Sequence, residues 1–498
     1  MKKALFILLT ITLVLLSACG EPEAETDPTV IDHQQFLSET VYIGSVLPLT
    51  GADSERAALL QAAQQTAAEV INGAWDDVDW DMAKNPGIAG YGGAWVELVC
   101  ADCGVEEPQP TAQPTSQVAQ QPAQQTSQTS AVAQPAANTQ AAANTQAAAN
   151  TQPAQQTASP AAVTPAELQQ LEDDAAAAAA QDLIDQGVVA LIGAYRSGPT
   201  AAAATVAAEA GRPLITGTAS LDSLTEDESY DFGLWFNRIA PTMDMHNRLF
   251  FSYVKHLNQT QQAGITKVAL AYKDDYFGRE VLESFNEEAA ALGLQVVARI
   301  AYKDETDDLA TAAARMMANG PEAVFHYGDP ADLSAFARYY GGAKFAPRAA
   351  FCYDVSFQDP AFRQAVTEAK AGYWYGLSAT LTRDEEEEGT ITSDASDLIR
   401  GDSDIFYFIN GIYSRKTGLD MDNEALYDFA AVMLIAQAAA EAGTTEPEQL
   451  AAALREGDFD APYLAAGHIS FSDLGQNEVS AGFLTNLTEN GEELAFQP

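Results

Sequence analysis

The sequence predicts an α/β protein whose parallel sheets are arranged in two lobes. Residues 188–193 and 213–216 are short apolar segments, and each runs into small polar residues and then a helical pattern. The same alternation of strand and helix returns over residues 267–353, and it is typical of a parallel sheet covered by helices. A chain of 498 residues is long enough for two such lobes.

The first lobe is expected to begin with a strand at residues 41–49, followed by a turn at Thr50 and Gly51. A helix then runs to Asn72 and Gly73, a pair that is typical of a helix end. A second strand is expected at 96–99 and a helix at 165–186, ahead of the strand at 188–193.

The second lobe is expected to repeat one strand and one helix in turn. Strands are predicted at 267–271, 294–301, 322–327 and 348–353, with helices at 278–292, 307–319 and 331–340. Beyond 372–377, helices are predicted at 404–417, 424–443 and 446–456, and late strands near 468–471 and 482–487. Ligands of parallel sheets bind at the carboxyl ends of the strands, where loops such as 194–200 and 217–220 lie.

A low-complexity segment interrupts the first lobe. Residues 107–160 are almost entirely Gln, Ala, Thr, Pro and Ser, with Ala-Ala-Asn-Thr-Gln repeats at 136–140, 142–146 and 148–152. Such a composition offers too little apolar surface to offset the entropy of ordering, so disorder is predicted. We interpret residues 104–164 as an insertion in a surface loop, because 42–99 is too short for a complete α/β domain. A linker between two domains is the alternative.

The first residues predict export and a lipid anchor. Lys2 and Lys3 precede an apolar run at 4–16, which is too short to span a bilayer, and Leu16-Ser17-Ala18-Cys19 resembles a bacterial lipobox. We therefore expect a signal peptide at 1–18, lipid on Cys19 and a tether at 19–40. An ordinary signal peptide with an incidental cysteine is the alternative. We expect no later segment to cross a membrane, so the body should be exported and anchored on the periplasmic or extracellular face.

Charge and motifs exclude several classes of function. With 70 acidic and 25 basic residues the formal charge is −45, which repels nucleic acid. The acidic run 384–388 lacks the spaced ligands and glycine of a calcium loop, so a solvated loop is expected and no metal site. The five histidines are scattered, and no nucleophile elbow, dinucleotide fingerprint or zinc motif is present. We expect neither an enzyme nor a cofactor.

Cys100 and Cys103 have the spacing Cys-x-x-Cys, while Cys352 stands alone. One such pair is weak evidence for zinc. In an exported chain a local disulfide or two free thiols is favoured, and redox or metal chemistry is less favoured.

Three segments together resemble the Leu/Ile/Val-binding family of ABC transporter substrate-binding proteins. They are residues 43–51, residues 188–225 and the motif Asp274-Asp275-Tyr276-Phe277-Gly278, all behind the lipobox. The resemblance implies a type I periplasmic-binding fold, with two Rossmann-like lobes joined by a three-strand hinge and a ligand held in the cleft by lobe closure. It implies a first lobe of 41–240 plus 377–470, a second lobe of 241–376 plus 471–498, and a monomer.

By this resemblance, Ser197 places a hydroxyl against the carboxylate of an amino-acid ligand, and Thr218 and Ser220 bind the same head group. Short side chains also let a ligand approach backbone N–H groups. The alternative is that Ser197 and Ser220 only cap helices. Across the cleft, Asp354 aligns with the acidic position of the family and Asp329 supports it, both as partners for an ammonium group.

Three further residues are candidates for the cleft. Phe277 stands where the family has a ligand-contacting tyrosine, although Tyr276 could take this place and Phe277 could pack in the core. Arg56 and Arg196 stand where branched-chain amino acid binders have neutral side chains. Each could bind a second carboxylate, pair with Asp329 or point into water.

The resemblance implies a lipoprotein that captures an amino acid, or a related small carboxylate or amide, and delivers it to an ABC permease. A receptor of the same fold that senses a ligand without transporting it is the alternative.

Overall fold

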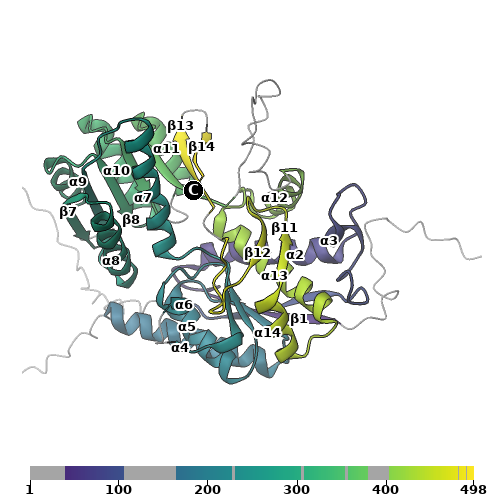
Figure 1. Ribbon diagram of the computed structural model, residues 1–498. Helices are drawn as coiled ribbons and strands as arrows, with labels where there is room; N and C mark the ends of the chain where they lie inside the picture. Colours follow the sequence, from purple (N-terminus) through teal and green to yellow (C-terminus); the bar gives the residue numbers. More distant parts are fainter. Residues whose placement is uncertain are drawn as a thin grey trace, which may run out of the picture.

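The computed structural model describes residues 40–105, 164–226, 230–303, 308–353, 357–379, 403–479, 482–488 and 491–497. They form two α/β lobes, which confirms the predicted fold class (Figure 1). Some sequence predictions fall outside the described residues. These are the signal peptide, Cys19, nearly all of the tether and of the insertion, Asp354 and the acidic run 384–388.

The first lobe has a parallel sheet of five strands in the order β2-β1-β3-β4-β5. Their bounds are β1 (Val41–Leu47), β2 (Val96–Asp102), β3 (Ala190–Gly193), β4 (Leu214–Thr216) and β5 (Phe236–Arg238). Leu191 packs toward α4 (Pro165–Asp185) and α5 (Ser197–Glu209), whereas Ile192 packs toward α2 (Ser54–Asn72) and α13 (Asn423–Ala442). Strands covered on both faces are apolar throughout, which explains the continuous apolar run at 188–193.

The chain on both sides of the insertion belongs to the first lobe. The chain leaves the sheet after β2, and it returns in α4, which packs on the same sheet beside Val46 and Leu191. Both flanks thus belong to one lobe, so residues 106–163 do not link two domains.

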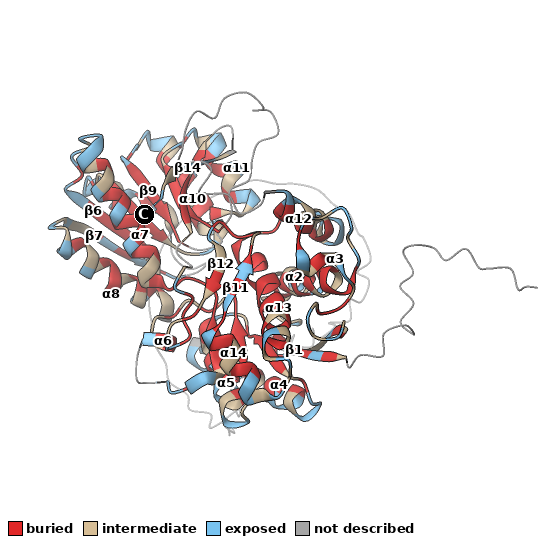
Figure 2. Ribbon diagram, turned by 45° about the vertical axis from the view of Figure 1, so that its right-hand side comes forward, coloured by how far each residue is buried: buried red, intermediate tan, exposed pale blue. Residues whose placement is uncertain are grey.

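Helix α13 lies at the centre of the first lobe. Among the described helices it is long and apolar enough to cross a membrane, but 78% of its apolar window is buried inside the protein. Figure 2 shows it almost entirely in the colour of buried residues. The sequence analysis had found no such segment beyond the signal peptide, and burial identifies this one as a core helix.

Further elements complete the first lobe around this core. They are α3 (Asp81–Lys84), α6 (Ser223–Glu226), α12 (Ser403–Thr417), α14 (Pro447–Glu456) and the antiparallel pair β11 (Asp458–Ala461) and β12 (Gly467–Ser470).

The second lobe has a sheet of seven strands in the order β14-β13-β10-β9-β8-β6-β7. The parallel part is β6 (Lys267–Lys273), β7 (Gln295–Tyr302), β8 (Ala323–Tyr327), β9 (Ala349–Cys352) and β10 (Trp374–Ser378). The strands β13 (Phe483–Thr488) and β14 (Gly491–Phe496) add an antiparallel edge, which the sequence analysis did not foresee. Since all of β10 lies in this sheet, its end at Ser378 places the lobe boundary slightly later than the expected 376/377.

Helices cover both faces of the second sheet. One layer contains α7 (Met243–Thr260) and α8 (Tyr276–Ala291), and the other contains α9 (Leu309–Ala318), α10 (Pro330–Ala343) and α11 (Pro360–Ala369). Helices α7 and α11 were not anticipated from the sequence.

The Cys-x-x-Cys pair forms no disulfide, and both thiols are free. The Cys100 Sγ lies 3.2 Å from Nε2 of Gln61 on α2, whereas Cys103 is buried in the cluster of α4 on the opposite face of the sheet. Because the two side chains leave the strand end in opposite directions, the local disulfide is not formed. Burial raises the pKa of Cys103 to about 12, so this thiol is unreactive at neutral pH.

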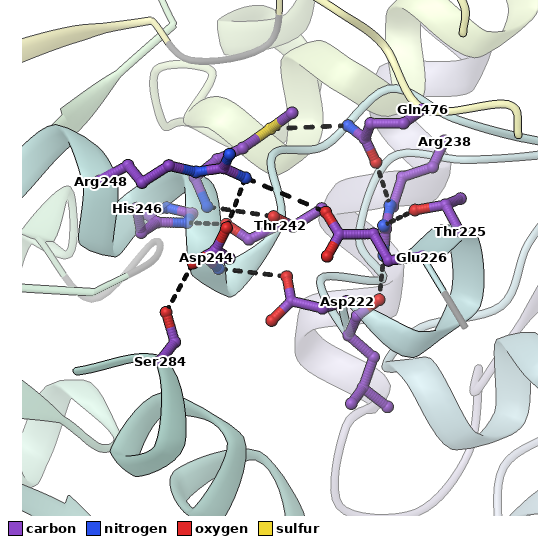
Figure 3. Close-up of polar contacts among 12 residues, drawn as sticks. Asp222, Thr225, Glu226, Arg238, Thr242, Asp244, His246, Arg248, Ser284 and Gln476 are labelled. Atoms are coloured by element: carbon purple, nitrogen blue, oxygen red, sulfur yellow. Dashed lines mark hydrogen bonds and ion pairs between the residues drawn. The ribbon is translucent and has the colours of Figure 1, made fainter. Parts of the chain in front are cut away.

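Two of the connections between the lobes run side by side. Arg238 pairs with Gln476 in a parallel bridge, and its N–H donates to the Gly475 carbonyl at 2.7 Å. The Arg238 guanidinium is fully buried and donates to Gln476 Oε1 at 2.6 Å, to the Leu221 carbonyl and to Thr225 Oγ1 (Figure 3). Burial lowers the pKa of Arg238 to about 10, which leaves it charged at neutral pH.

Replacing Arg238 by methionine should destabilise the protein strongly. Arg238→Met keeps an apolar stem but leaves three buried acceptors without their donor, so the free energy of unfolding should fall by about 3 kcal/mol. Urea denaturation followed by tryptophan fluorescence measures this loss. Arg248→Met is the control, because the Arg248 side chain is 52% exposed and its ion pair with Asp244 should contribute less than about 1 kcal/mol. Equal losses in both variants would contradict a special role for Arg238.

Candidate functional site

A cavity of about 160 Å³ lies between the two lobes, where strands of both sheets end. We call it the cleft cavity. Its lining from the first lobe is Tyr195, Arg196, Thr218, Ser220 and Glu424. Its lining from the second lobe includes Lys273, Asp275, Phe277, Tyr327, Asp329 and Tyr353. This space is many times the roughly 10–15 Å³ that one water needs, so a small solute can enter it.

A smaller cavity of about 20 Å³ continues from the cleft toward the hinge. We call it the inner cavity. It shares Thr218, Ser220 and Glu424 with the cleft cavity, and His246, Leu377 and Tyr427 are among its other lining residues. The three shared residues therefore mark the inner end of the cleft.

A larger hollow of about 470 Å³ lies elsewhere, on the first lobe alone. Thr205 and Glu209 of α5 line it together with Tyr230 and Trp235. If volume alone decided, this hollow and not the cleft would be the ligand-binding site. We take the cleft as the site because it lies at the carboxyl ends of the strands and is bounded by both lobes.

Ser197 does not line either cleft cavity. It is fully buried, and its Oγ accepts hydrogen bonds from the backbone N–H groups of Ser220 at 3.1 Å and Leu221 at 3.2 Å. The hydroxyl thus fastens the loop after β4 to the start of α5. This arrangement differs from both expectations for Ser197, contact with a ligand carboxylate and a helix cap.

Thr218 and Ser220 do lie at the cavity wall, as expected for cleft residues. Thr218 Oγ1 donates to the Ala194 carbonyl at 2.9 Å. The preceding Gly217 allows a close approach, since a Cβ there would lie 2.7 Å from Oδ1 of Asp428. The loop therefore rests directly on α13, and only glycine fits at the contact.

Arg56 has none of the three partners considered for it. Its guanidinium pairs with Asp422 at 2.5 Å and with Glu424 at 2.6 Å, both at the start of α13. Burial acts to lower the pKa of Arg56, but the two carboxylates more than offset it and raise the pKa well above its ordinary value. Burial likewise acts to raise the pKa of Asp422, and Arg56 brings it below its ordinary value. Arg56 lines neither cavity, and it is a structural cation that pairs with Glu424 of the wall rather than a free anion receptor.

Arg196 lines the cleft cavity but is also paired. Its Nη2 lies 2.7 Å from Oδ1 of Asp53, and the arginine side chain remains 45% exposed. The pairing with an acid of its own lobe was not among the expectations, which considered Asp329, a ligand or water.

Charges of the second lobe are paired in the same way. Lys273, the last residue of β6, lies 2.7 Å from Oδ2 of Asp329, which precedes α10. Asp275 accepts the Gly278 N–H at 2.7 Å and begins α8, and burial raises its pKa. A Cβ on Gly278 would lie 1.9 Å from the Lys273 carbonyl, so the motif requires glycine there.

Phe277 lines the cleft cavity and also packs against the core cluster of the first lobe. Both expectations for this residue, cleft and core, thus describe part of its position. The side chain of Tyr276 and all of Asp354 lie outside the described residues.

Four further lining residues of the cleft cavity were not predicted from the sequence, namely Glu424, Lys273, Tyr327 and Tyr353. Lys273 and Tyr327 end strands and Tyr353 directly follows one, so the rule that ligands bind at strand ends could have found them. Glu424 carries no such local signal, because it reaches the cleft through the packing of α13.

Asp428 lies one helical turn beyond Glu424 and is also buried. Gln64 Nε2 donates to its Oδ2 at 2.8 Å. Burial raises the pKa of Asp428 to about 7, so the carboxyl is half protonated near neutral pH. Arg56, Asp422 and Gln64 are the other groups that act on it.

Stability should depend on the proton of Asp428. The folded protein keeps this proton up to about pH 7, whereas an unfolded aspartate loses it near pH 4, so stability falls as pH rises between these values. Asp428→Asn removes this loss and should be more stable than the unsubstituted protein at pH 8, by at most about 4 kcal/mol. At pH 4.5 the advantage should be largely absent.

Urea denaturation at both pH values measures the difference. Asp422→Asn is the control with the opposite sign, because the pKa of Asp422 is lowered and its charge stabilises the fold at neutral pH. An Asp428→Asn effect that is the same at both pH values would contradict the titration.

Comparisons with known proteins agree with this two-lobed fold. A profile of the periplasmic binding protein family matches residues 169–491, more than half of the chain. A comparison with curated protein sequences finds no match.

Solved structures of similar proteins cover nearly the whole chain. The branched-chain amino acid transporter substrate-binding protein LivJ from Streptococcus pneumoniae, in complex with isoleucine, is 18% identical with a TM-score of 0.59, covering 91% of this chain and 98% of its own. The leucine-binding protein LivK from Thermotoga maritima is 16% identical with a TM-score of 0.58, covering 92% and 98%. A solute-binding protein of an ABC transporter from R. palustris, in complex with benzoate, is 14% identical with a TM-score of 0.58, covering 91% and 95%. The chain thus belongs to the periplasmic binding protein family and shares the fold of substrate-binding proteins of branched-chain amino acid ABC transporters.

Proposed function

We propose that this chain is an extracytoplasmic solute-binding lipoprotein that captures a small polar solute of amino-acid size and delivers it to an ABC permease. The cleft cavity carries this proposal, because both lobes line it and its volume of about 160 Å³ suits a small molecule. Family membership supports binding rather than catalysis and an exported location. Similar proteins were solved with isoleucine and with benzoate, so the fold accepts different small ligands.

The lining favours a polar ligand over a branched aliphatic one. Charged side chains at the wall are Arg196, Lys273, Asp275, Asp329 and Glu424, and phenol groups come from Tyr195, Tyr327 and Tyr353. Met243 and Phe277 are the larger apolar contributions. A leucine side chain would have to displace water from several charges without replacing its hydrogen bonds, which is costly. An amino acid with a polar side chain, or a related small polar molecule, fits the wall better.

The hinge supports capture by closure. The paired connections at Arg238 and Gln476 lie behind the inner cavity, and Ala240 and Pro241 of the first connection line that cavity. A hinge at the closed end of the cleft lets the outer ends of the lobes separate to admit a ligand. Thr218, Ser220, Phe277, Asp329 and Arg196 are proposed to contact the ligand in this closed state.

A ligand that binds in the cleft should stabilise the folded protein, and a large side chain that fills the cleft should remove this effect. At a concentration of one hundred times Kd, a ligand adds about 2.7 kcal/mol to the free energy of unfolding. A thermal-shift screen with all standard amino acids, their amides and small carboxylates should therefore find at least one stabilising compound. Ser220→Trp fills the inner end of the cleft and should abolish that stabilisation.

Thr205→Trp is the matched control, because it fills the larger hollow on the first lobe. It should leave the stabilisation intact, and the melting temperature without ligand reports whether either variant folds. Loss in Thr205→Trp with retention in Ser220→Trp would move the site to the hollow. A screen in which no compound stabilises the protein would refute solute capture of this class.

The lipid anchor is proposed at Cys19, which follows Leu16-Ser17-Ala18. In a bacterial host the full chain should fractionate with membranes, and Cys19→Ser should appear in the soluble extracytoplasmic fraction. Mass spectrometry should find acyl groups on the N-terminal peptide of the anchored form. Cys100→Ser should remain in the membrane fraction, and membrane association of Cys19→Ser would contradict the anchor.

A further inference from the structure

The inner end of the cleft has few donors left for an anion. The Ser220 and Leu221 N–H groups donate to Ser197 Oγ. The N–H groups of Thr218 and Ala219 each lie 3.3 Å from Thr216 Oγ1, and the Thr218 hydroxyl donates to the Ala194 carbonyl. The N–H groups of this loop therefore already have acceptors within the first lobe, and a ligand carboxylate would have to compete for them.

The same end of the cleft presents acceptors. Glu424 is 5% exposed and lines both the cleft cavity and the inner cavity. Its Oε2 accepts from Arg56 Nε at 2.8 Å and pairs with Arg56 Nη2 at 2.6 Å, and an ionised carboxylate acts only as an acceptor. Thr218 Oγ1 has donated its hydrogen and keeps lone pairs that can accept, and the Ser220 hydroxyl can accept as well. The three residues shared by the two cavities thus each offer an oxygen acceptor.

The charged side chains that line the two cavities also favour a cationic ligand group over an anionic one. Three acids, Asp275, Asp329 and Glu424, line the cavities together with Arg196, Lys273 and the imidazole of His246. Arg196 is paired with Asp53 and Lys273 with Asp329, so the cations of the wall already have carboxylate partners. A carboxylate placed beside Glu424 would meet a like charge away from water, which is strongly unfavourable, while an ammonium would gain a charge-assisted hydrogen bond.

We infer that the inner end of the cleft binds the cationic nitrogen of an organic amine, so that the ligand turns its ammonium group, and not a carboxylate, toward Glu424, Thr218 and Ser220. Three acceptors match the three N–H donors of a primary ammonium. Any carboxylate of the ligand then lies toward Arg196 and Lys273 at the outer end. The inference rests on the proposed capture of a small solute and reverses the head-group orientation that the sequence suggested. Its ligand chemistry covers both amino acids and amines without a carboxylate.

Matched compounds test this orientation on the unsubstituted protein. Each standard amino acid is compared with its decarboxylated amine and with the acid that carries hydrogen in place of the amino group, such as serine, ethanolamine and 3-hydroxypropionate. Thermal shift and isothermal titration calorimetry should show that the amine keeps binding and that the acid loses it by at least tenfold. Retention by the acid with loss by the amine would overturn the inference but leave solute capture standing.

Glu424→Gln tests the same point when only the intact amino acid binds. It should weaken binding at least tenfold, the size expected for loss of a charge-assisted hydrogen bond. Glu209→Gln is the matched control, since it changes the charge equally at an exposed residue that lines the hollow on the first lobe and not the cleft. It should change Kd by less than about threefold, because exposed charges are screened by water. Equal effects in both variants would overturn the inference.

Ser220→Ala covers the case in which Glu424→Gln does not fold. It removes one acceptor without touching the Arg56 ion pairs, and it should weaken amine binding several-fold while leaving the melting temperature of the unliganded protein unchanged. Unchanged amine binding in Ser220→Ala would count against the inference. A complete absence of binding by all three compound classes would instead remove the proposed function, and the inference with it.

Discussion

The position of the cleft depends on how the chain crosses between the lobes. Arg238 ends the last strand of the first sheet, and its main chain is hydrogen-bonded to Gly475 and Asn477 of another crossing segment. Its side chain reaches Leu221 and Thr225, which follow the loop that forms the inner wall of the cleft. The buried Arg238 guanidinium thus holds two crossing segments and the loop at 217–220 in fixed positions relative to each other. Since the donors of arginine have a rigid planar geometry, this arrangement tolerates little displacement.

The start of α13 joins the core of the first lobe to the site. Asn423 binds the Leu377 carbonyl and the Ala379 N–H of another crossing segment, at 3.0 and 2.9 Å. Glu424 is the next residue and lines the cleft, while Asp428 supports Gly217 one turn later. Asn423, Glu424 and Asp428 therefore contact the hinge, the cleft cavity and the loop at 217–220, in that order. A change in the charge of Glu424 or Asp428 is felt by the other, because Arg56 interacts with both carboxyl groups.

The sequence predicted the alternation of strands and helices better than it predicted which residues pair with the charged side chains. Strands such as β3, β6 and β8 were found because buried parallel strands are apolar throughout and end in small polar residues. Helix α7 was overlooked although its buried Leu249, Phe250, Val254 and Leu257 follow a helical spacing. The antiparallel edge β13–β14 could not be foreseen, since the direction of strand pairing leaves no local trace in one strand.

The site was predictable only in part, for a physical reason. Loop residues at strand ends are placed by the fold, so Thr218, Ser220, Arg196 and Phe277 were found at the cleft. The partner of a charged side chain is set by contacts that are remote in the chain. Arg56 binds Asp422, which lies 366 residues away, and nothing near Arg56 in the sequence indicates that its charge is already neutralised.

The pairing of nearly every cation in the cleft has a consequence for how a ligand is chosen. A buried cation without a partner would attract any anion strongly, including inorganic ones that are abundant outside the cell. Here Arg196 and Lys273 of the wall each hold a protein carboxylate, so an anion must displace an existing ion pair to gain one. Such an exchange yields little net free energy, because the ion pair that is lost resembles the one that is gained and partly exposed pairs contribute little. Selectivity then depends on groups that can bind a ligand without breaking an ion pair. At the inner end these are the oxygen acceptors of Glu424, Thr218 and Ser220. The same pairing that stabilises the wall therefore biases the cleft toward donors of hydrogen bonds and positive charge.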